Sequence, residues 1–252
     1  MDVEAVLAEY RAKGFARLGP VLDEPTLLAL RARADAIMLG EVVIPGLFFQ
    51  HDAASGRYED LELGRGFIGP SLDYRKIEKL ELDPLFRGVI AHPAIEPLVR
   101  AWIGEDVVLY RSILMTKGRD GGTFLPFHQD GGNFWGVDRN PDLQIWFAID
   151  DAPVEAGCVE IVPGSHVGGL ATPLGGVIPE NILRAGDAEA RVIPVPARAG
   201  EAILIHNHVW HRSGQNRSGH PRRGFSVCYM PASTRCVRKK RAPRQFFRVF
   251  TG

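Results

Sequence analysis

From residue 107 onward, the sequence consists of short apolar runs separated by turns that contain glycine and proline. Each run is shorter than a typical helix, and the turn residues at both ends predict a series of β-strands. Several short strands at near-regular spacing are typical of a β-sandwich or β-barrel, which constrains the fold more than any other feature. The expected strands cover residues 107–116, 143–149, 158–162, 191–195, 202–206 and 225–230.

The N-terminal part of the chain reads mainly as helices. Apolar residues recur at helical spacing from Val3 until Gly14 ends the run. Asp23 is the expected N-cap of a second helix, with Pro25 in its first turn and an end near Leu39. Further helices are expected near residues 84–91 and 93–103, and the buried stripe of the second helix is expected to comprise Leu27, Leu28, Leu30 and Ile37.

Residues 41–75 contain many glycines and prolines and show no clear period. A long irregular segment in a compact domain is often a lid or binding loop, and a loop that only wraps the core is the alternative. No repeat or linker divides the chain, so we expect one domain over residues 1–252. Within it we expect a mostly helical and lid region (1–105), a β core (106–232) and a basic C-terminal segment (233–252).

The charges are balanced, with 30 Lys and Arg against 30 Asp and Glu. This composition gives no general attraction to nucleic acid or to an anionic membrane. Three cysteines without recognisable spacing argue against a disulfide framework or a zinc knuckle. The first residues do not resemble a signal peptide, and no apolar run approaches the ~20 residues of a membrane span. We therefore expect a cytoplasmic protein, and the composition leaves its oligomeric state open.

The segment Phe127-His128-Gln129-Asp130 is the most informative for function. On a strand, side chains two residues apart point to one face, so His128 and Asp130 would project together. An imidazole and a carboxylate supply two of the ligands of a 2-His-1-carboxylate site, which suits iron(II) and leaves coordination positions open. Because a His-x-Asp pattern often arises by chance, the prediction depends on a third ligand elsewhere in the chain.

That third ligand would come from the histidine-rich segment 206–211. His206 and His208 could act as a pair, as in other metal-binding sandwiches, or His211 could complete the site. If the residues after His211 form a hairpin, His211 and Arg222 lie on neighbouring strands. The guanidinium of Arg222 could then bind the distal carboxylate of a 2-oxoacid that chelates the metal at its other end. A surface ion pair is the alternative role for Arg222, because Arg223 beside it is equally basic.

Several segments together resemble, in order and spacing, the phytanoyl-CoA dioxygenase family of iron(II)/2-oxoglutarate-dependent oxygenases. They are residues 127–130, residues 156–166 with the turn Pro163-Gly164-Ser165-His166, and residues 210–216 followed by Arg222-Arg223. The resemblance covers about residues 107–230. It implies a mainly β fold with flanking helices, in which N-terminal helices pack on a double-stranded β-helix, the cupin-like jelly roll.

The resemblance also implies the site and its cofactors. It makes His128, Asp130 and His211 the Fe(II) ligands and Arg222 the anchor of the cosubstrate 2-oxoglutarate, with O2 as oxidant. The implied activity is hydroxylation of a small organic molecule, with succinate and CO2 as coproducts. Asp130 favours hydroxylation over halogenation, which would need that coordination position for a halide. Weaker correspondences place Lys76, Gln129, Trp146 and Ser213 around the cosubstrate.

The sequence does not identify the substrate. Asn133 and Trp135 follow the ligand pair and are the candidates for its binding. A basic run from Arg235 to Arg248 could receive an anionic substrate, and a solvated face is the alternative. Two other functions stay open at this point. One is a cupin-type metal enzyme that does not use 2-oxoglutarate, and the other is a non-catalytic binding module of the same fold.

Overall fold

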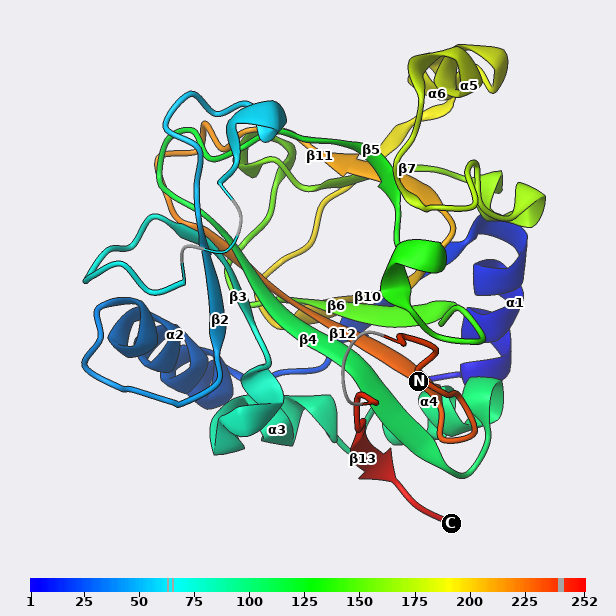
Figure 1. Ribbon diagram of the computed structural model, residues 1–252, viewed down its shortest axis with the longest axis horizontal. Coiled ribbons are helices and arrows are strands. Elements are labelled where there is room, and N and C mark those ends of the chain that lie inside the picture. Colours follow the sequence, from blue (N-terminus) through cyan, green and yellow to red (C-terminus); the bar gives the residue numbers. More distant parts are fainter. Residues whose placement is uncertain (63, 65, 240–242) are drawn as a thin grey trace.

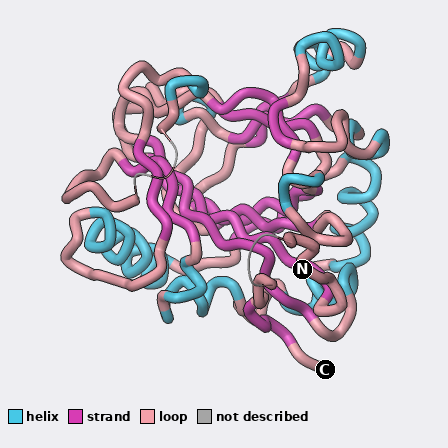
Figure 2. Tube along the Cα trace, in the orientation of Figure 1, coloured by secondary structure: helices cyan, strands magenta, loops and turns pink. Residues whose placement is uncertain are grey.

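A larger and a smaller antiparallel β-sheet lie face to face in the computed structural model, which describes residues 1–62, 64, 66–239 and 243–252 (Figures 1 and 2). This arrangement confirms the mainly β fold with flanking helices, and the facing sheets form the expected jelly roll. In order across the larger sheet lie β1 (Phe15–Pro20), β10 (Glu201–His206), β6 (Leu143–Ala148), β12 (Arg222–Pro231), β4 (Val107–Lys117), β3 (Tyr74–Glu78) and β2 (Phe48–His51), with β13 (Phe247–Phe250) paired to β4. Across the smaller sheet lie β8 (Gly176–Val177), β5 (Leu125–Gln129), β11 (Trp210–Ser213), β7 (Val159–Val162) and β9 (Ile193–Val195).

The central strands of the larger sheet are buried on both faces. In β6, Leu143, Ile145 and Phe147 pack into the core that the helices cover. The alternate residues Gln144 and Trp146 line the cavity between the sheets. Because side chains of a strand alternate between its faces, every second residue of such a strand serves the core and the others are available for a binding site.

The four α-helices described within residues 3–103 pack against the larger sheet and contribute to this core, whereas the two within residues 180–191 lie by the smaller sheet (Figure 1). As predicted, Gly14 ends the first helix with a φ of 79°, and the Asp23 carboxylate accepts a hydrogen bond from Thr26 N at 3.0 Å. The prediction for Leu28 was wrong, because this side chain lies off the 3.6-residue stripe and is exposed. The buried stripe comprises Leu27, Leu30, Ala34, Ile37 and Met38. The helices are α1 (Val3–Lys13), α2 (Glu24–Met38), α3 (Pro84–Ile90), α4 (Glu96–Ile103), α5 (Glu180–Ala185) and α6 (Ala188–Arg191), and short 3-10 turns cover Tyr58–Asp60, Leu80–Leu82, Asn133–Trp135, Val154–Ala156 and Ser165–Gly168.

Strands also occur where the sequence predicted helices, a lid or a basic tail. β1 lies between α1 and α2, while β2 and β3 extend the larger sheet beyond β4. β13 lies in the C-terminal segment. These strands are short and lie at or near sheet edges, so their pairing depends on the neighbouring strand more than on their own pattern. The lid prediction for residues 41–75 includes Leu63 and Arg65, which lie outside the described residues.

Over the described ranges, no helix combines the length and the apolar character needed to cross a lipid bilayer.

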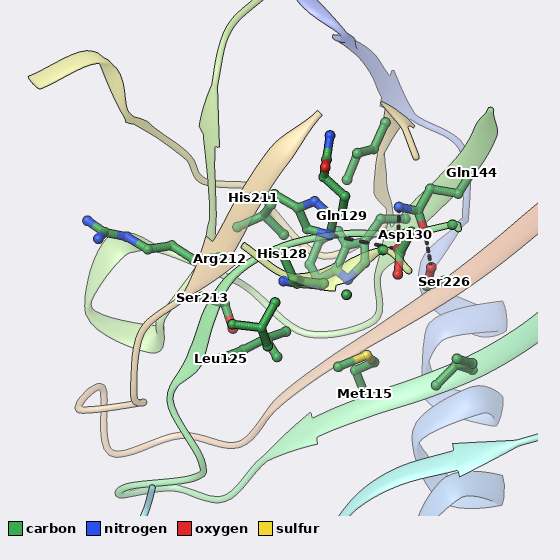
Figure 3. A pocket seen from close by; sticks show the side chains of 18 of the residues that line it. Met115, Leu125, His128, Gln129, Asp130, Gln144, His211, Arg212, Ser213 and Ser226 are labelled. Atoms are coloured by element: carbon green, nitrogen blue, oxygen red, sulfur yellow. Dashed lines mark hydrogen bonds and ion pairs between the residues drawn. The ribbon is translucent and has the colours of Figure 1, made fainter. Parts of the chain in front are cut away.

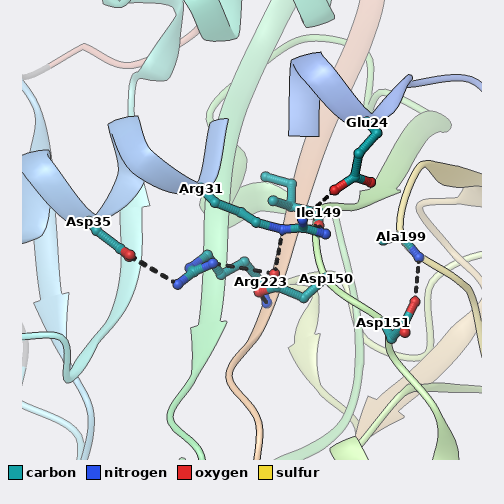
Figure 4. A network of polar contacts seen from close by, with 8 residues as sticks. All are labelled: Glu24, Arg31, Asp35, Ile149, Asp150, Asp151, Ala199 and Arg223. Carbon is teal, nitrogen blue, oxygen red and sulfur yellow. Dashed lines mark hydrogen bonds and ion pairs between the residues drawn. The ribbon is translucent and has the colours of Figure 1, made fainter. Parts of the chain in front are cut away.

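Arg223 joins the larger sheet to α2 (Figure 4). Its Nη2 donates to Asp35 Oδ1 at 3.0 Å, and its backbone N donates to Asp150 Oδ2 at 3.0 Å. Arg31 of α2 also donates from Nε to Asp150 Oδ1, at 2.9 Å. Arg223 therefore faces the helices, whereas its neighbour Arg222 faces the space between the sheets. This orientation excludes Arg223 as a ligand anchor inside the jelly roll.

We predict that Arg223→Met lowers the free energy of unfolding by about 2–3 kcal/mol. Removing one partner of a largely buried ionic network leaves the other charge uncompensated, and the partial exposure of Asp35 reduces the effect. Urea denaturation would measure the change, with Arg217→Met as the control because Arg217 is an exposed arginine in the preceding loop. Equal midpoints for the two variants would contradict the structural role of Arg223.

Candidate metal centre

His128 and His211 lie directly opposite each other in the antiparallel pair of β5 and β11 (Figure 3). Their ring centroids are 4.0 Å apart. Asp130 follows β5, and its Oδ2 lies 3.8 Å from Nε2 of His211. One potential ligand atom from each of these three residues lies within 4.8 Å of the others, which is close enough for a single metal ion to bind all three.

A backbone carbonyl orients each imidazole. His128 Nδ1 lies 2.9 Å from the oxygen of Pro126, and His211 Nδ1 lies 2.9 Å from the oxygen of Val209. Because a carbonyl only accepts, each Nδ1 carries a proton, and Nε2 is the nitrogen that faces the site as a possible metal ligand. Burial, followed by the neighbouring His211, lowers the pKa of His128 to about 3. The His128 imidazole is therefore neutral at neutral pH, as metal binding requires.

Two polar side chains from the larger sheet hold the Asp130 carboxylate. Arg111 Nη2 lies 2.7 Å from Asp130 Oδ2, and Gln144 Nε2 donates to the same oxygen at 2.9 Å. Ser226 Oγ donates to Gln144 Oε1 at 2.9 Å, which fixes the orientation of the amide (Figure 3). Burial alone would raise the pKa of Asp130, but Arg111 and the two imidazoles lower it below its ordinary value. The site thus presents two imidazole nitrogens and an ionised carboxylate, a donor set that fits iron(II).

Arg111, Gln144 and Ser226 were missed by the sequence reasoning. Each of them lies in a strand whose other residues are mostly apolar. A buried polar side chain needs a partner, so a charged or amide residue in the middle of such a strand was an available signal. That signal could not identify Asp130 as the partner, because Asp130 follows β5 of the other sheet.

The centre opens into a cavity of about 430 Å³, a size that accommodates small organic ligands. Arg222 lies in its wall and is 3% exposed. Its Nη2 donates to the oxygen of Gly157 at 2.8 Å, and Nε has no hydrogen-bond partner among the described residues. The guanidinium lies 6.0 Å from the ring of Trp146. Arg222 is therefore not a surface ion-pair residue, and its side chain retains an unused donor.

The sequence prediction that His211 and Arg222 lie on neighbouring strands was wrong. His211 belongs to β11 in the smaller sheet and Arg222 to β12 in the larger sheet. The intervening residues connect the sheets and do not form a two-stranded hairpin. His211 and Arg222 nevertheless line the same cavity, from opposite sheets.

Most of the predicted cosubstrate residues also line this cavity. Ser213 is buried two residues after His211 and shares its face of β11 (Figure 3). Trp146 lies in the wall formed by β6, and its ring occupies the space where Gly224 of β12 has no side chain. Lys76 is half-buried, and its Nζ lies 2.5 Å from Glu78 Oε1, so its charge is compensated within the protein.

Gln129 lines the cavity, but its amide is used elsewhere. Nε2 donates to the oxygens of Gly169 and His208 at 2.8 and 2.6 Å, and Oε1 accepts from Ala171 N at 2.6 Å. These hydrogen bonds hold the loop after β7. Both amide hydrogens of Gln129 are therefore used within the protein, which leaves no donor for the predicted contact with a cosubstrate.

The mouth of the cavity comprises Tyr58, Phe134, Leu174 and Val177. Phe134, Leu174 and Val177 are 73, 62 and 45% exposed, which is unusual for such apolar side chains. Trp135, the other candidate substrate residue, is buried and lines the cavity. Asn133 is exposed and is not among the residues that line the cavity, so its predicted contact with a substrate stays a prediction.

The basic C-terminal segment lies away from the cavity interior. Of its described residues, none lines the cavity. Arg238 donates from Nη2 to the oxygen of Phe134 at 2.9 Å, and Arg244 Nη2 donates to the oxygen of Tyr110. Arg238 therefore supports the backbone at the mouth, and Arg244 supports that of β4. Lys240 and Arg241 lie outside the described residues.

His206 and His208, the alternative ligand pair, point to a different environment. Nδ1 of His206 accepts a hydrogen bond from His208 N at 3.0 Å, and the two rings lie 5.2 Å apart. Within the described part of the chain, the only group of three or more His, Cys, Asp or Glu side chains close enough to hold a metal is that of His128, Asp130 and His211. The geometry thus favours His211 over the alternative pair.

Comparison with known proteins is consistent with this site. A model of the family described as phytanoyl-CoA dioxygenase (PhyH) matches residues 10–224. The chain is 32% identical over 158 residues to "Phytanoyl-CoA dioxygenase domain-containing protein 1" of Mus musculus, a match that covers 60% of this chain and 54% of the mouse protein. The chain thus spans about half the length of that curated relative.

Two further similarities cover more of both proteins. "Phytanoyl-CoA dioxygenase, peroxisomal" of Mus musculus is 23% identical over 240 residues, covering 90% of this chain and 68% of the mouse protein. The crystal structure of "the non-heme alpha ketoglutarate dependent epimerase SnoN from nogalamycin biosynthesis" is similar with a TM-score of 0.73 and 21% identity, covering 99% of this chain and 95% of that one. At this identity the structural similarity supports the fold.

We predict that His211→Ala weakens binding of Co(II), a spectroscopic substitute for iron(II), more than roughly 100-fold. This exceeds the loss that is typical when only a supporting residue of a metal site is removed. Titration of the metal-free protein, followed by the visible absorption of Co(II), would measure the affinity. His208→Ala is the matched control, because this imidazole lies outside the group. A larger loss in His208→Ala than in His211→Ala would contradict the assignment.

Proposed function

We propose a function that starts from family membership, since the chain belongs to the phytanoyl-CoA dioxygenase family. The protein is an iron(II)- and 2-oxoglutarate-dependent oxygenase that hydroxylates a small organic molecule. The observation that carries this proposal is the position of Arg222. Its buried guanidinium shares one cavity with the group of His128, Asp130 and His211, on the facing sheet. A metal at that group and a cation deeper in the cavity together match the two ends of a 2-oxo dicarboxylate.

The residues of the group would bind the metal through His128 Nε2, His211 Nε2 and the Asp130 carboxylate. When bound, iron(II) supplies the activation of dioxygen that oxidises 2-oxoglutarate to succinate and CO2 and the substrate to its hydroxylated product. Arg111 and Gln144 hold the Asp130 carboxylate in position before any ligand arrives. This preorganisation limits the reorganisation that metal binding would otherwise require.

Arg222 and Ser213 would bind the distal carboxylate of 2-oxoglutarate. The guanidinium offers a planar pair of donors, and its Nε has no partner among the residues described. Ser213 lies on the same wall as His211, so a ligand held by both would bridge the anchor and the metal. Trp146 and the other apolar walls keep water away from this end, which strengthens the ionic contacts.

Formation of succinate from 2-oxoglutarate tests the proposed function. We expect the iron-loaded protein to convert 2-oxoglutarate to succinate slowly without substrate, and Arg222→Met to raise the KM for 2-oxoglutarate roughly 10–100-fold, since a charged hydrogen bond contributes about 1.5–3 kcal/mol. Quantifying succinate by chromatography would measure both. Arg217→Met serves as the control, because Arg217 is exposed. No succinate from a protein that binds iron, or an unchanged KM in Arg222→Met, would contradict the proposal.

The mouth supports a substrate with an apolar, uncharged surface. Its exposed side chains are apolar, and the basic residues nearby are already paired with carboxylates. Lys76 pairs with Glu78, Arg111 with Asp130, and Arg212 with Glu160 at 2.6 Å. A charged substrate group would have to compete for these pairs, whereas an apolar surface would gain from burial against Phe134, Leu174 and Val177.

We therefore expect neutral aromatic or alicyclic alcohols to stimulate succinate formation more than their carboxylate or CoA-thioester counterparts. Matched neutral and anionic compounds with the same ring system would be compared in the succinate assay. Phe134→Asp should reduce the stimulation by neutral compounds about tenfold, since it replaces an apolar contact worth about 1.5 kcal/mol with a charge. Stronger stimulation by the CoA thioesters would contradict the expected substrate class.

A further inference from the structure

A second cation lies directly across from Arg222. Lys117, the last residue of β4, is the register partner of Arg222 in the antiparallel pair of β4 and β12. Like charges at directly opposed positions of a sheet repel each other. Both side chains are also buried, at 6% exposure for Lys117 and 3% for Arg222, so water does not screen the repulsion. Such a pair is unfavourable unless something compensates it.

A third cation joins them from β3. Arg75 is 8% exposed and lines a small cavity of about 10 Å³ together with Lys117 and Arg222. This cavity has the space of about one water molecule. Arg75, Met115, Leu125, Ser213 and Arg222 line both it and the larger cavity. Of these two cavities, Lys117 lines only the small one. We call the region of Arg75, Lys117 and Arg222, where the small cavity adjoins the larger one, the inner end.

The hydrogen-bond partners of these cations are uncharged. Lys117 Nζ donates to the oxygen of Thr123 at 2.6 Å, and Arg75 Nη1 donates to Gln50 Oε1 at 2.9 Å. Among the residues that the structure describes, no carboxylate forms an ion pair with any of the three cations. Asp52 acts electrostatically on Lys117 and Arg75, and its Oδ1 accepts from Thr123 N at 2.7 Å. Asp150 acts on Arg222 in the same way, but it is bonded to Arg223 and Arg31 on the helical side. A buried concentration of positive charge without a matching anion indicates a site for an anionic ligand.

We propose that Lys117 and Arg75 complete the site for the distal carboxylate of 2-oxoglutarate, and that Lys117 takes up a proton when this carboxylate binds. This inference rests on the proposed function. It adds to it a lysine that the sequence reasoning did not single out and a link between cosubstrate affinity and pH. The proton comes from solvent and converts the neutral amine to an ammonium beside the incoming negative charge, so the charge added to the inner end is compensated.

The environment of Lys117 explains why it would start neutral. Burial, and after it the charge of Arg222, lowers the pKa of Lys117 to about 6, with Arg75 acting in the same direction and Asp52 opposing it. Above that pH the amine of the empty protein is uncharged. A carboxylate in contact favours the charged form and raises the pKa. Between the two pKa values, affinity falls as pH rises, while below about pH 6 the amine is already charged and this dependence disappears.

Calorimetric titration of 2-oxoglutarate into the iron-loaded protein under argon tests the inference. We expect the affinity to fall by up to about tenfold for each unit between about pH 7 and about pH 9. Repeating the titration in buffers with different ionisation enthalpies counts the protons, and we expect an uptake of close to one per ligand. Lys117→Met should bind roughly 10–100-fold more weakly at about pH 7 and lose this dependence. Lys117→Arg should keep the affinity at high pH, because arginine stays charged.

The controls separate this inference from the proposed function. Lys13→Met removes an exposed lysine that pairs with Glu9 and should behave as the wild-type protein. Pyruvate keeps the oxoacid end but lacks the distal carboxylate, so its binding should take up no proton through Lys117. A pH dependence that persists in Lys117→Met, or that pyruvate shares, would overturn the inference while leaving the oxygenase proposal intact.

If 2-oxoglutarate does not bind, the proposed function is wrong, and titration with glutarate then tests this inference separately. Glutarate carries the same carboxylates without the oxo group. If a carboxylate of glutarate pairs with the cations of the inner end, glutarate should bind weakly and with the same uptake of one proton. Failure of glutarate to bind under those conditions would overturn this inference as well.

Discussion

The pairing of β5 with β11 is the constraint on which the site depends. Only one register of this antiparallel pair sets His128 opposite His211, and a shift by one residue would turn one of the imidazoles to the other face of the sheet. Each ring is then oriented by a carbonyl of its own strand segment. The ligand geometry is therefore a property of backbone pairing, with side-chain contacts to Asp130 added from the facing sheet.

Side chains alternate between the two faces along each strand of the larger sheet, so that one face packs against the helices and the other lines the cavity. Arg222 and Arg223 are neighbours in sequence, yet one faces the cavity and the other binds Asp35 and Asp150 on the helical side. The helices let these strands be apolar on one face and polar on the other while both faces are buried. The inner face can then carry charges that would be unfavourable in an ordinary core, because a bound ligand can compensate them.

Local patterns in the sequence predicted a β-sandwich or barrel, most helices and the His128/Asp130 pair, whereas the jelly roll and the choice of His211 came from the family resemblance. Helix caps at Gly14 and Asp23 and the His-x-Asp spacing are read within a few residues. Features that depend on pairing were less accessible. The sequence placed Arg222 beside His211 on one sheet, but the chain crosses to the other sheet between them. Arg111 and Lys117 were missed because their roles arise from Asp130 and Arg222, which only the fold brings near them.

Among the residues described, the basic side chains at the inner end lack the carboxylate partners that those in the rest of the cavity have. Outside the inner end, Lys76, Arg111 and Arg212 each have a carboxylate partner, so the charges in this part of the cavity are compensated, and the mouth presents apolar side chains to a ligand. At the inner end, Arg75, Lys117 and Arg222 bond to neutral oxygens. Within the described part of the chain, Arg75 and Arg222 are buried cations without a carboxylate partner, and the lowered pKa of Lys117 avoids a third charge beside them until an anion binds. A protein built in this way would gain stability from its anionic ligand in addition to the chemistry that the ligand supports.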